Sequence, residues 1–188
     1  MSTPGSAVPP VLVVGVGNDL RRDDGVGREV AEAVARAFPR TVDVLTTHQL
    51  LPELLEQFTD RRMVIVVDAS VQQRSGGPVR VHRVHRGGVC SEGGLVPRSV
   101  PVTGDCPGVP VARQGSGRGS AHAMGLRGVL ALAGVAGIPC PECWSVTVTA
   151  YDLGLGEGLS PGTRVLVERA VRLVVALAGR GWSDPQEA

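Results

Sequence analysis

VLVVGVGNDLRRDDGVG, residues 11–27, joins a continuous apolar run to a loop rich in glycine and aspartate. The run VLVVGV (11–16) is typical of a strand that is buried on both faces of a parallel sheet. After the loop, apolar residues recur at helical spacing, at Val26, Val30, Ala33 and Ala37. This spacing predicts an amphipathic helix that ends before Pro39. The stretch therefore predicts the strand–loop–helix unit with which an α/β domain begins.

The rest of the chain alternates between β-rich runs and helical periodicity. Further strands are predicted at 42–47, 62–70, 78–86 and 144–151, and further helices at 51–58, at 121–136 and after 160. Ser120 and Ser160 suit the N-caps of the last two helices. The alternating pattern of 78–86 predicts a half-exposed edge strand. We therefore expect an α/β fold with a mostly parallel, twisted sheet that is flanked by helices on both faces.

The whole chain, residues 1–188, is expected to form a single domain, because its length is sufficient for one substantial core. Residues 1–10 are predicted to be a flexible N-terminus and residues 181–188 a C-terminal tail. Residues 87–119 are rich in glycine, proline and valine and have no clear periodicity, which predicts a long loop or insertion.

The composition argues against several classes of protein. A formal net charge of +1 and an aromatic content of 3% give no footprint for nucleic acid. No apolar run is long enough to span a bilayer, and MSTPGSAVPP lacks the pattern of a signal peptide. We therefore expect a cytoplasmic protein that contacts neither nucleic acid nor membrane. The absence of lysine excludes a P-loop and Schiff-base chemistry, since both need its amine.

Three residues are candidates for a metal site. Asp24 follows the first strand by a short loop, and Asp68 closes the third strand. Ligand sites of open α/β sheets lie beyond the carboxyl ends of the strands. His122 would fall in the first turn of the helix capped by Ser120, where the helix dipole favours a neutral ring. Two carboxylates and an imidazole suit nickel, zinc or a similar ion. The alternative is that the aspartates only cap a helix or bond a neighbouring loop.

Four sequence motifs resemble a known family. They are GVGNDLRRDDGVG (15–27), VVDA (66–69), SAHAMGL (120–126) and GEGLSP (156–161). These motifs are similar to those of the hydrogenase maturation proteases, and the resemblance runs from about Val11 to the last helix. That family consists of endopeptidases that remove a C-terminal extension from the large-subunit precursor of nickel–iron hydrogenases after nickel insertion.

The resemblance implies an aspartyl-type endopeptidase whose partner is such a precursor. We expect a monomer only as the default for a small enzyme with a protein substrate. It places the contacts to the substrate's nickel on Asp24, Asp68 and His122, the same three residues. It also implies that Gly17 and Asn18 shape the loop and that Asp23 is structural. The chain departs from many members in carrying TTHQLLPEL (46–54) in place of an Asp-Gly-Gly turn, which is similar to the branch serving soluble, cofactor-linked hydrogenases. His48 could border the substrate cleft in this branch, but a surface histidine is the simpler interpretation and the one we prefer.

Several alternatives stay open at this point. Water could be activated by the metal or by a free carboxylate acting as base. A non-cleaving accessory protein could use the same three ligands. A dinucleotide site is disfavoured, because Leu20 stands where a third glycine is needed. A structural zinc site would use Cys140 and Cys143 of the CPEC motif, with Cys90 and Cys106 or with His82 and His85. The alternative for CPEC is a tight turn with incidental thiols.

Overall fold

The computed structural model describes residues 10–39, 41–71, 77–85, 88–90 and 125–179. The strands are β1 (Val11–Val16), β2 (Asp43–Thr47), β3 (Met63–Ser70), β4 (Val79–His85), β5 (Gly88–Cys90) and β6 (Glu142–Thr149). The helices are α1 (Val26–Ala37), α2 (Leu55–Phe58), α3 (Leu126–Val135) and α4 (Pro161–Ala178). Short 3-10 turns, Arg22–Gly25 and Pro52–Leu54, precede α1 and α2. The predicted strands and helices occur in the predicted order, and the structure adds one strand, β5, that was not predicted.

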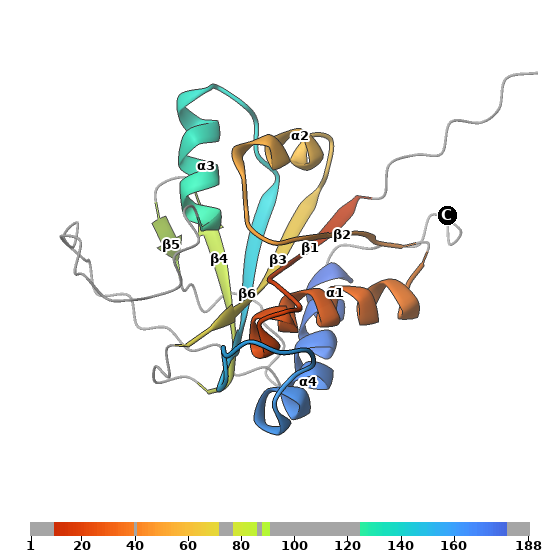
Figure 1. Ribbon diagram of the computed structural model, residues 1–188. Coiled ribbons are helices and arrows are strands. Elements are labelled where there is room, and N and C mark those ends of the chain that lie inside the picture. The colour runs from red at the N-terminus through yellow and green to blue at the C-terminus, as the bar shows by residue number, and fades with distance from the viewer. Residues whose placement is uncertain (1–9, 40, 72–76, 86–87, 91–124, 180–188) are drawn as a thin grey trace, which may run out of the picture.

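The six strands form one sheet in the order β2-β1-β3-β6-β4-β5 (Figure 1). The neighbouring strands β2, β1, β3 and β6 run parallel to one another, whereas β4 is antiparallel to β6 and β5 is antiparallel to β4. The prediction of β4 as the edge strand is wrong, because β5 pairs beyond it. β5 lies within the predicted loop 87–119, and a strand of three residues is too short to show alternation in the sequence. The other residues of that loop, and of the two predicted tails except Pro10, lie outside the described residues.

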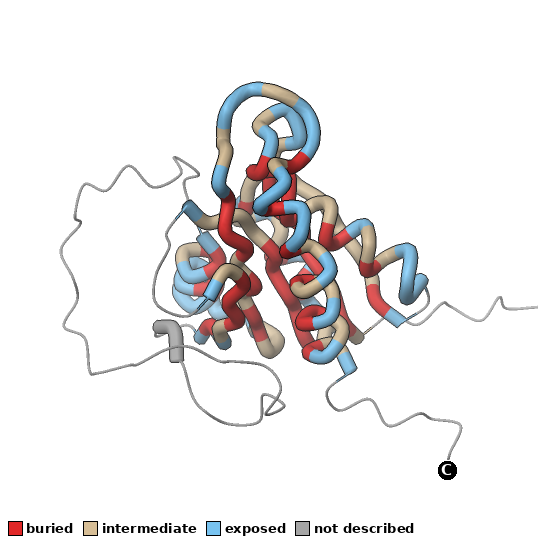
Figure 2. The backbone as a smooth tube through the Cα atoms, turned by 90° about the horizontal axis from the view of Figure 1, so that it is seen from below, coloured by how far each residue is buried: buried red, intermediate tan, exposed pale blue. Residues whose placement is uncertain are grey.

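Helices cover both faces of the sheet, as predicted (Figure 1). On one face, α1 and α4 pack against alternate residues of the strands, such as Val13 of β1 and Ile65 of β3. On the other face, α2 and α3 pack against the intervening residues, such as Val14 and Val66. Buried residues accordingly concentrate in the strands and on the inner sides of the helices (Figure 2). Both faces of β1 and β3 are buried, which explains their unbroken apolar sequences.

Two details of the predicted helices are corrected. The buried side of α1 is formed by Val26, Val30, Ala31 and Val34, whereas Ala37 is exposed. Ala37 is the last residue of the helix, next to the exposed C-cap Phe38, and lies beyond the last buried residue, Val34. Helix α3 begins at Leu126 after Gly125 in an extended conformation, and not at 121. Ser120 is therefore not its N-cap; Ser120 and His122 lie outside the described residues.

The start of α4 agrees with its prediction. The Ser160 hydroxyl accepts a hydrogen bond from the Thr163 N–H at 3.3 Å, and Pro161 occupies the first turn. Such a cap satisfies a backbone donor that the helix itself cannot pair.

In the described part of the chain, no helix combines the length and the apolar character that crossing a bilayer requires.

Candidate active site at the carboxyl ends of the parallel strands

The loop that joins β1 to α1, residues 17–25, contains Asp23 and Asp24 and is called the acidic loop. It lies where the carboxyl ends of β1, β2 and β3 meet. The Gly17 N–H donates to the Thr47 carbonyl, 3.0 Å away at the end of β2. Gly15 of β1 pairs in register with Val67 of β3, so Asp68 follows at the same edge. The strand order therefore brings Asp24 and Asp68 to one edge of the sheet, where open α/β sheets hold their ligands.

Three glycines make this close packing possible. A Cβ on Gly17, whose φ is +143°, would lie 1.8 Å from the Asp24 carbonyl oxygen. A Cβ on Gly27 would lie 2.3 Å from the Val16 carbonyl oxygen and 2.4 Å from that of Val67. Gly15 faces the same helix, since its Cβ would approach the Ala31 side chain to 2.7 Å. The glycines thus serve the contact between helix α1 and the strand ends, which other residues would prevent.

Asp24 is buried, with 6% of its surface exposed. Its Oδ2 accepts a hydrogen bond from the Asn18 N–H at 3.0 Å. The Asn18 Oδ1 accepts in turn from the Leu20 N–H at 3.0 Å. Gly17 and Asn18 therefore do shape the loop beside Asp24. Oδ2 is held by this bond at the strand-end edge.

Asp23, the neighbouring acid, is fully buried and anchors the loop to the start of α4. Its carboxylate accepts from the N–H groups of Tyr151, Asp152 and Ser160 at 2.6–2.8 Å. It also accepts from the hydroxyls of Ser160 and Thr163 at 2.8 and 2.7 Å. Burial alone would raise the pKa of Asp23, but these hydrogen bonds outweigh it and lower the pKa to about 2. Asp23 is structural, as expected.

Asp68 is half-buried near the end of β3. Its Oδ1 accepts from the Ala69 N–H at 2.7 Å. In register it pairs with Thr147 of β6, and Thr147 pairs with Arg80 of β4. The three residues form one row across the sheet, on the face that carries α2 and α3.

Arg80 is the residue at this edge that the sequence interpretation missed. Its surface is only 8% exposed, although an arginine in a strand of alternating polar and apolar residues is predicted to face the solvent. Its Nε donates to the Thr147 hydroxyl at 3.3 Å, and its Nη2 donates to the Ser70 hydroxyl at 3.0 Å. Arg80, His82 and Val84 alternate along β4 and therefore lie on one face of the strand. The sequence does not show whether that face is buried or exposed, so it gives no signal that Arg80 is buried.

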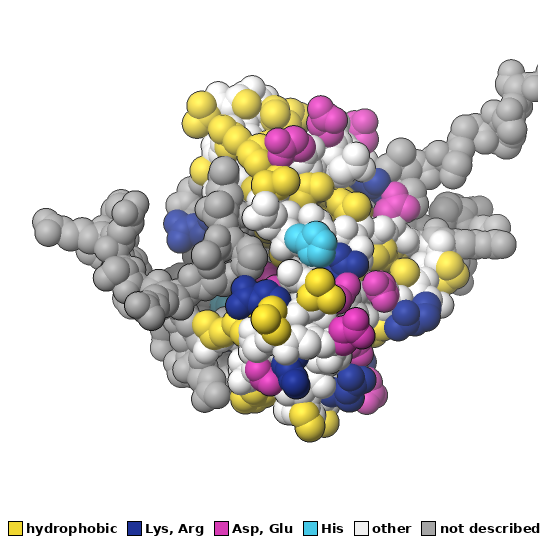
Figure 3. Space-filling model, viewed as in Figure 1, with side chains coloured by type: hydrophobic (Ala, Val, Ile, Leu, Met, Phe, Trp, Pro, Cys, Tyr) yellow, Lys and Arg dark blue, Asp and Glu magenta, His cyan; other side chains and the backbone are white. Residues whose placement is uncertain are grey.

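His122, the third predicted ligand, lies outside the described residues, and its place in the site stays a prediction. Among the described residues, no group of three or more histidine, cysteine or acidic side chains is arranged to hold a metal ion. His48 is exposed, in agreement with its interpretation as a surface residue. On the face seen in Figure 3, acidic side chains gather at the top, near α2, whereas acidic and basic side chains are interspersed lower down.

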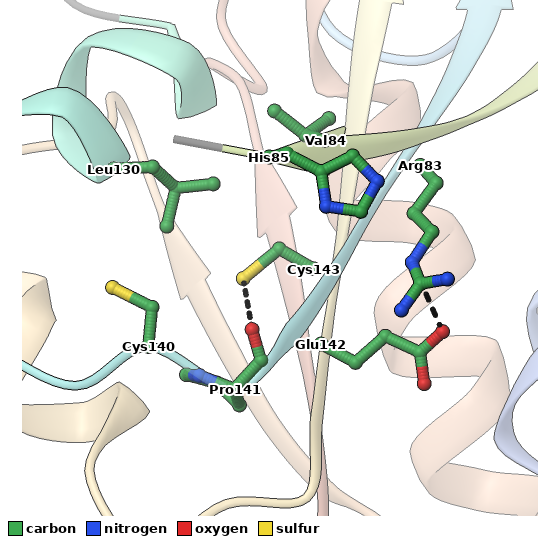
Figure 4. Close-up of a pocket in the computed structure, with 8 residues that line it drawn as sticks. All are labelled: Arg83, Val84, His85, Leu130, Cys140, Pro141, Glu142 and Cys143. Atoms are coloured by element: carbon green, nitrogen blue, oxygen red, sulfur yellow. Dashed lines mark hydrogen bonds and ion pairs between the residues drawn. The ribbon is translucent and has the colours of Figure 1, made fainter. Parts of the chain in front are cut away.

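The cysteines of CPEC lie at the other end of the sheet. Glu142 pairs with Met63 at the amino end of β3, so Cys140 and Cys143 are remote from Asp68. They line a hollow of about 490 Å³ under Leu130 of α3 (Figure 4). The Cys143 Sγ donates to the Pro141 carbonyl at 3.4 Å. Burial, followed by the nearby Cys140 and Glu142, raises the pKa of the Cys143 thiol to about 12.

The proposed zinc site at these cysteines stays untested. Both Cys140 and Cys143 are free thiols. The backbone of Cys90 pairs with Arg83, whereas Cys143 pairs with the next residue, Val84. Cys106 lies outside the described residues. A hydrogen-bonded turn through Pro141 accounts for the CPEC geometry without a metal.

The chain is similar to known proteins in its three-dimensional structure. No protein-family model and no curated protein sequence matches the chain. Among solved structures, the hydrogenase maturating endopeptidase HybD from Escherichia coli has a TM-score of 0.62 and 24% identity, over 91% of this chain and 93% of that one.

Two archaeal structures are also similar. The nickel–iron hydrogenase maturation protease HybD from Thermococcus kodakarensis has a TM-score of 0.60 and 20% identity, over 89% of this chain and 98% of that one. The protease HycI from Thermococcus kodakarensis has a TM-score of 0.53 and 20% identity, over 92% and 94%. The likeness spans nearly the full length of each chain, and the sheet order brings the two predicted acids to one edge. The chain has the fold of the hydrogenase maturation proteases.

Proposed function

We propose that this protein is an endopeptidase that removes the C-terminal extension of a nickel–iron hydrogenase large-subunit precursor after nickel insertion. The observation that carries the proposal is that Asp24, in the loop after β1, and Asp68, near the end of β3, lie at the same carboxyl edge of the sheet, in the fold of the maturation proteases. The loop between β1 and α1 ends in a carboxylate that is positioned by main-chain bonds, and not in a phosphate cradle.

In this proposal nickel is part of the substrate. The precursor presents a nickel ion on its cysteine thiolates, and the ion retains room for further ligands. Asp24, Asp68 and the predicted ligand His122 bind that ion from the enzyme side, because carboxylate oxygen and neutral imidazole suit nickel. Binding fixes the neighbouring peptide bond relative to the enzyme, and positioning alone supplies a large part of a rate enhancement.

The chemistry of cleavage follows from the same residues. The nickel supplies Lewis acidity toward a carbonyl or a water molecule. Asp24 accepts the Asn18 N–H through Oδ2, and we assign the contact with a ligand or a proton to its other oxygen, Oδ1. A carboxylate of this edge that is not bound to nickel could act as the general base. A precursor without nickel lacks the ion that these residues bind, so the enzyme cleaves only a precursor into which nickel has already been inserted.

The test is the mass of the precursor after incubation with the enzyme. The nickel-loaded precursor is expected to lose its C-terminal extension, and the metal-free precursor is expected to keep it. Asp24→Asn and Asp68→Asn are expected to abolish shortening with the fold retained, because asparagine preserves the shape and one acceptor oxygen. The matched control is Asp19→Asn in the same loop, whose side chain is 57% exposed. It is expected to cleave normally.

The outcomes separate the proposal from its alternative. An unchanged mass with confirmed nickel loading would show a binding protein that does not cleave. Near-normal cleavage by Asp24→Asn or Asp68→Asn would remove that residue from the site. The expected monomeric state and cytoplasmic location belong to the proposal, and size-exclusion chromatography and cell fractionation check them.

A further inference from the structure

Two exposed leucines lie close to the buried acids of the candidate site. Leu20 belongs to the acidic loop and is 61% exposed, and Leu155, in the loop that follows β6, is 85% exposed. They are the two most exposed leucines in the described part of the chain. A single exposed leucine is ordinary in a folded protein, whereas exposed apolar side chains that lie together mark a surface that binds a partner.

The main chain places the two leucines next to each other. Arg21 and Gly156 form a parallel bridge between the acidic loop and the loop after β6, which lie side by side (Figure 1). The Gly156 N–H donates to the Leu20 carbonyl at 3.0 Å. Leu20 and Leu155 each directly precede a bridged residue, so the parallel register makes them neighbours. Leu20 and Leu155 are called the leucine pair.

The conformation that presents the leucine pair is imposed by the fold. Arg22 has a φ of +45°, in the left-handed region that residues other than glycine rarely adopt. Such a conformation costs free energy and persists only where the surrounding contacts determine it. The Arg22 N–H donates to the Gly156 carbonyl at 2.9 Å, and its Nε donates to the Leu155 carbonyl at 3.5 Å. The leucine pair is therefore held in place before a partner arrives, which reduces the entropy lost on binding.

The leucine pair is linked to Asp24 through Asn18. The Asn18 side-chain oxygen accepts from the Leu20 N–H, and the Asn18 N–H donates to the Asp24 carboxylate, both at 3.0 Å. A molecule that brings a metal ion to Asp24 therefore arrives beside Leu20. In the proposed function that molecule is a protein. A specific protein contact buries roughly 800 Å² on each partner, which is far more surface than two carboxylates provide. The precursor therefore covers the surface around Asp24 as well.

We propose that the leucine pair is a docking surface for the nickel-loaded precursor, which covers it with apolar side chains that lie near its nickel-bearing cysteines. Burial of the leucines supplies affinity that does not depend on the metal, while the carboxylates recognise the nickel. This inference rests on the proposed function and names the surface with which the enzyme binds that partner.

The test measures initial rates of shortening at increasing concentrations of the nickel-loaded precursor. Leu20→Ser combined with Leu155→Ser is expected to raise KM roughly tenfold or more, because the apolar contact is lost. The kcat is expected to stay within about twofold of the wild type, since that contact is the same in the ground state and the transition state. Leu20→Met combined with Leu155→Met keeps an apolar surface and is expected to keep KM near the wild-type value.

A matched control comes from the other end of the sheet. Val135 is 88% exposed and is the last residue of α3, whose end leads toward the amino end of β6. Val135→Ser is expected to change neither KM nor kcat. Circular dichroism shows whether each variant folds. If the double serine variant does not fold, Leu155→Ser alone is used, and its KM is expected to rise roughly threefold or more.

Three results would overturn the inference. The first is a wild-type KM in the folded serine variants. The second is a fall in kcat without a change in KM, which would show that the leucines maintain the loop and do not contact the precursor. The third is an enzyme that is dimeric by light scattering and becomes monomeric in the serine variants with KM unchanged. The leucine pair would then be a contact between two copies of this chain.

Failure of this inference is distinguishable from failure of the proposed function. If the wild type shortens the precursor and the serine variants do so with the same KM, only the docking surface fails. If the wild type binds the nickel-loaded precursor without shortening it, the proposed function fails, and surface plasmon resonance then tests the leucine pair. A dissociation constant raised roughly tenfold in the serine variant would support the docking surface, and an unchanged one would overturn it. If the wild type neither shortens nor binds the precursor, both fail.

Discussion

Asp23→Asn is the sharpest test of how the acidic loop is held. The Asp23 carboxylate accepts hydrogen bonds from three main-chain N–H groups and two hydroxyls. Oδ2 takes four of them, and Oδ1 takes the Ser160 N–H. An asparagine amide directs N–H groups at one of these sets of donors, whichever way it is turned. The variant therefore loses the charge and leaves buried donors unpaired.

The magnitude follows from the pKa and from the unpaired donors. A pKa lowered from 3.8 to about 2 means that ionised Asp23 stabilises the fold by about 2.5 kcal/mol over its neutral form, at about 1.4 kcal/mol for each pKa unit. Unpaired buried donors cost about 1–3 kcal/mol more. We expect a loss of about 3.5–5.5 kcal/mol in the free energy of unfolding at pH 7. At about 2–4 °C per kcal/mol, the midpoint of thermal unfolding falls by roughly 7–22 °C.

The assay is urea unfolding of wild type and Asp23→Asn between pH 7 and pH 2. The folded-state pKa of Asp23 is lowered, so its stabilisation is complete above the unfolded-state value of 3.8 and is lost as pH falls through about 2. The difference between the two proteins is therefore expected to be constant near neutral pH and to shrink between about pH 4 and pH 2. The control Asp19→Asn, at an exposed carboxylate of the same loop, weakens only a partly exposed ion pair with Arg28 and is expected to cost less than about 1 kcal/mol.

A difference below about 1 kcal/mol at neutral pH would refute the reasoning. So would a difference that persists unchanged at pH 2, because the carboxylate charge would then contribute nothing. A large loss with the predicted pH dependence would establish that Asp23 ties the acidic loop to the first turn of α4.

Four other tests address the loop, the cap and the cysteines. Gly17→Ala is expected to cost more than about 2 kcal/mol of stability and most of the cleavage activity, because its Cβ would meet the Asp24 carbonyl; Gly125→Ala, with nothing within 4 Å, is the control. Ser160→Ala is expected to cost about 1–2 kcal/mol in urea unfolding through the lost cap; a neutral result would contradict that role. Cys143, whose thiol pKa is raised to about 12, is expected to resist iodoacetamide at pH 8 in mass spectrometry, and labelling in the folded state would show it accessible. Cys140→Ser with Cys143→Ser is expected to leave precursor cleavage largely unchanged, and a loss of activity together with bound zinc would indicate a structural zinc site.

Local sequence was sufficient for most elements of the fold. The strands β1 and β3 are predictable because both of their faces are buried, which leaves unbroken apolar runs. The start of α4 is predictable because a serine followed by proline is a local capping signal. The start of α3 is not predictable in this way: the periodicity predicts a start at 121, but the helix begins at Leu126. The residues before Gly125 carry no local signal that stops a helix.

The burial of Arg80 could not be predicted in this way. Alternation in a strand separates its two faces but does not say which face is covered. Arg80, His82 and Val84 share one phase, yet only Arg80 and Val84 are buried. That outcome depends on Thr147 and Ser70, which lie on two other strands.

The sequence by itself determined the order of strands and helices and the chemistry of the glycine–aspartate loop. Those properties depend on side chains a few residues apart, whose periodicity and turn preferences act locally. Only the tertiary structure decided that Asp23 meets Ser160, 137 positions along the chain, and that Asp68, Thr147 and Arg80 share one row. The physical reason is that such contacts are set by strand order and register. Strand order and register come from packing the whole core, and no short segment of the chain contains that information.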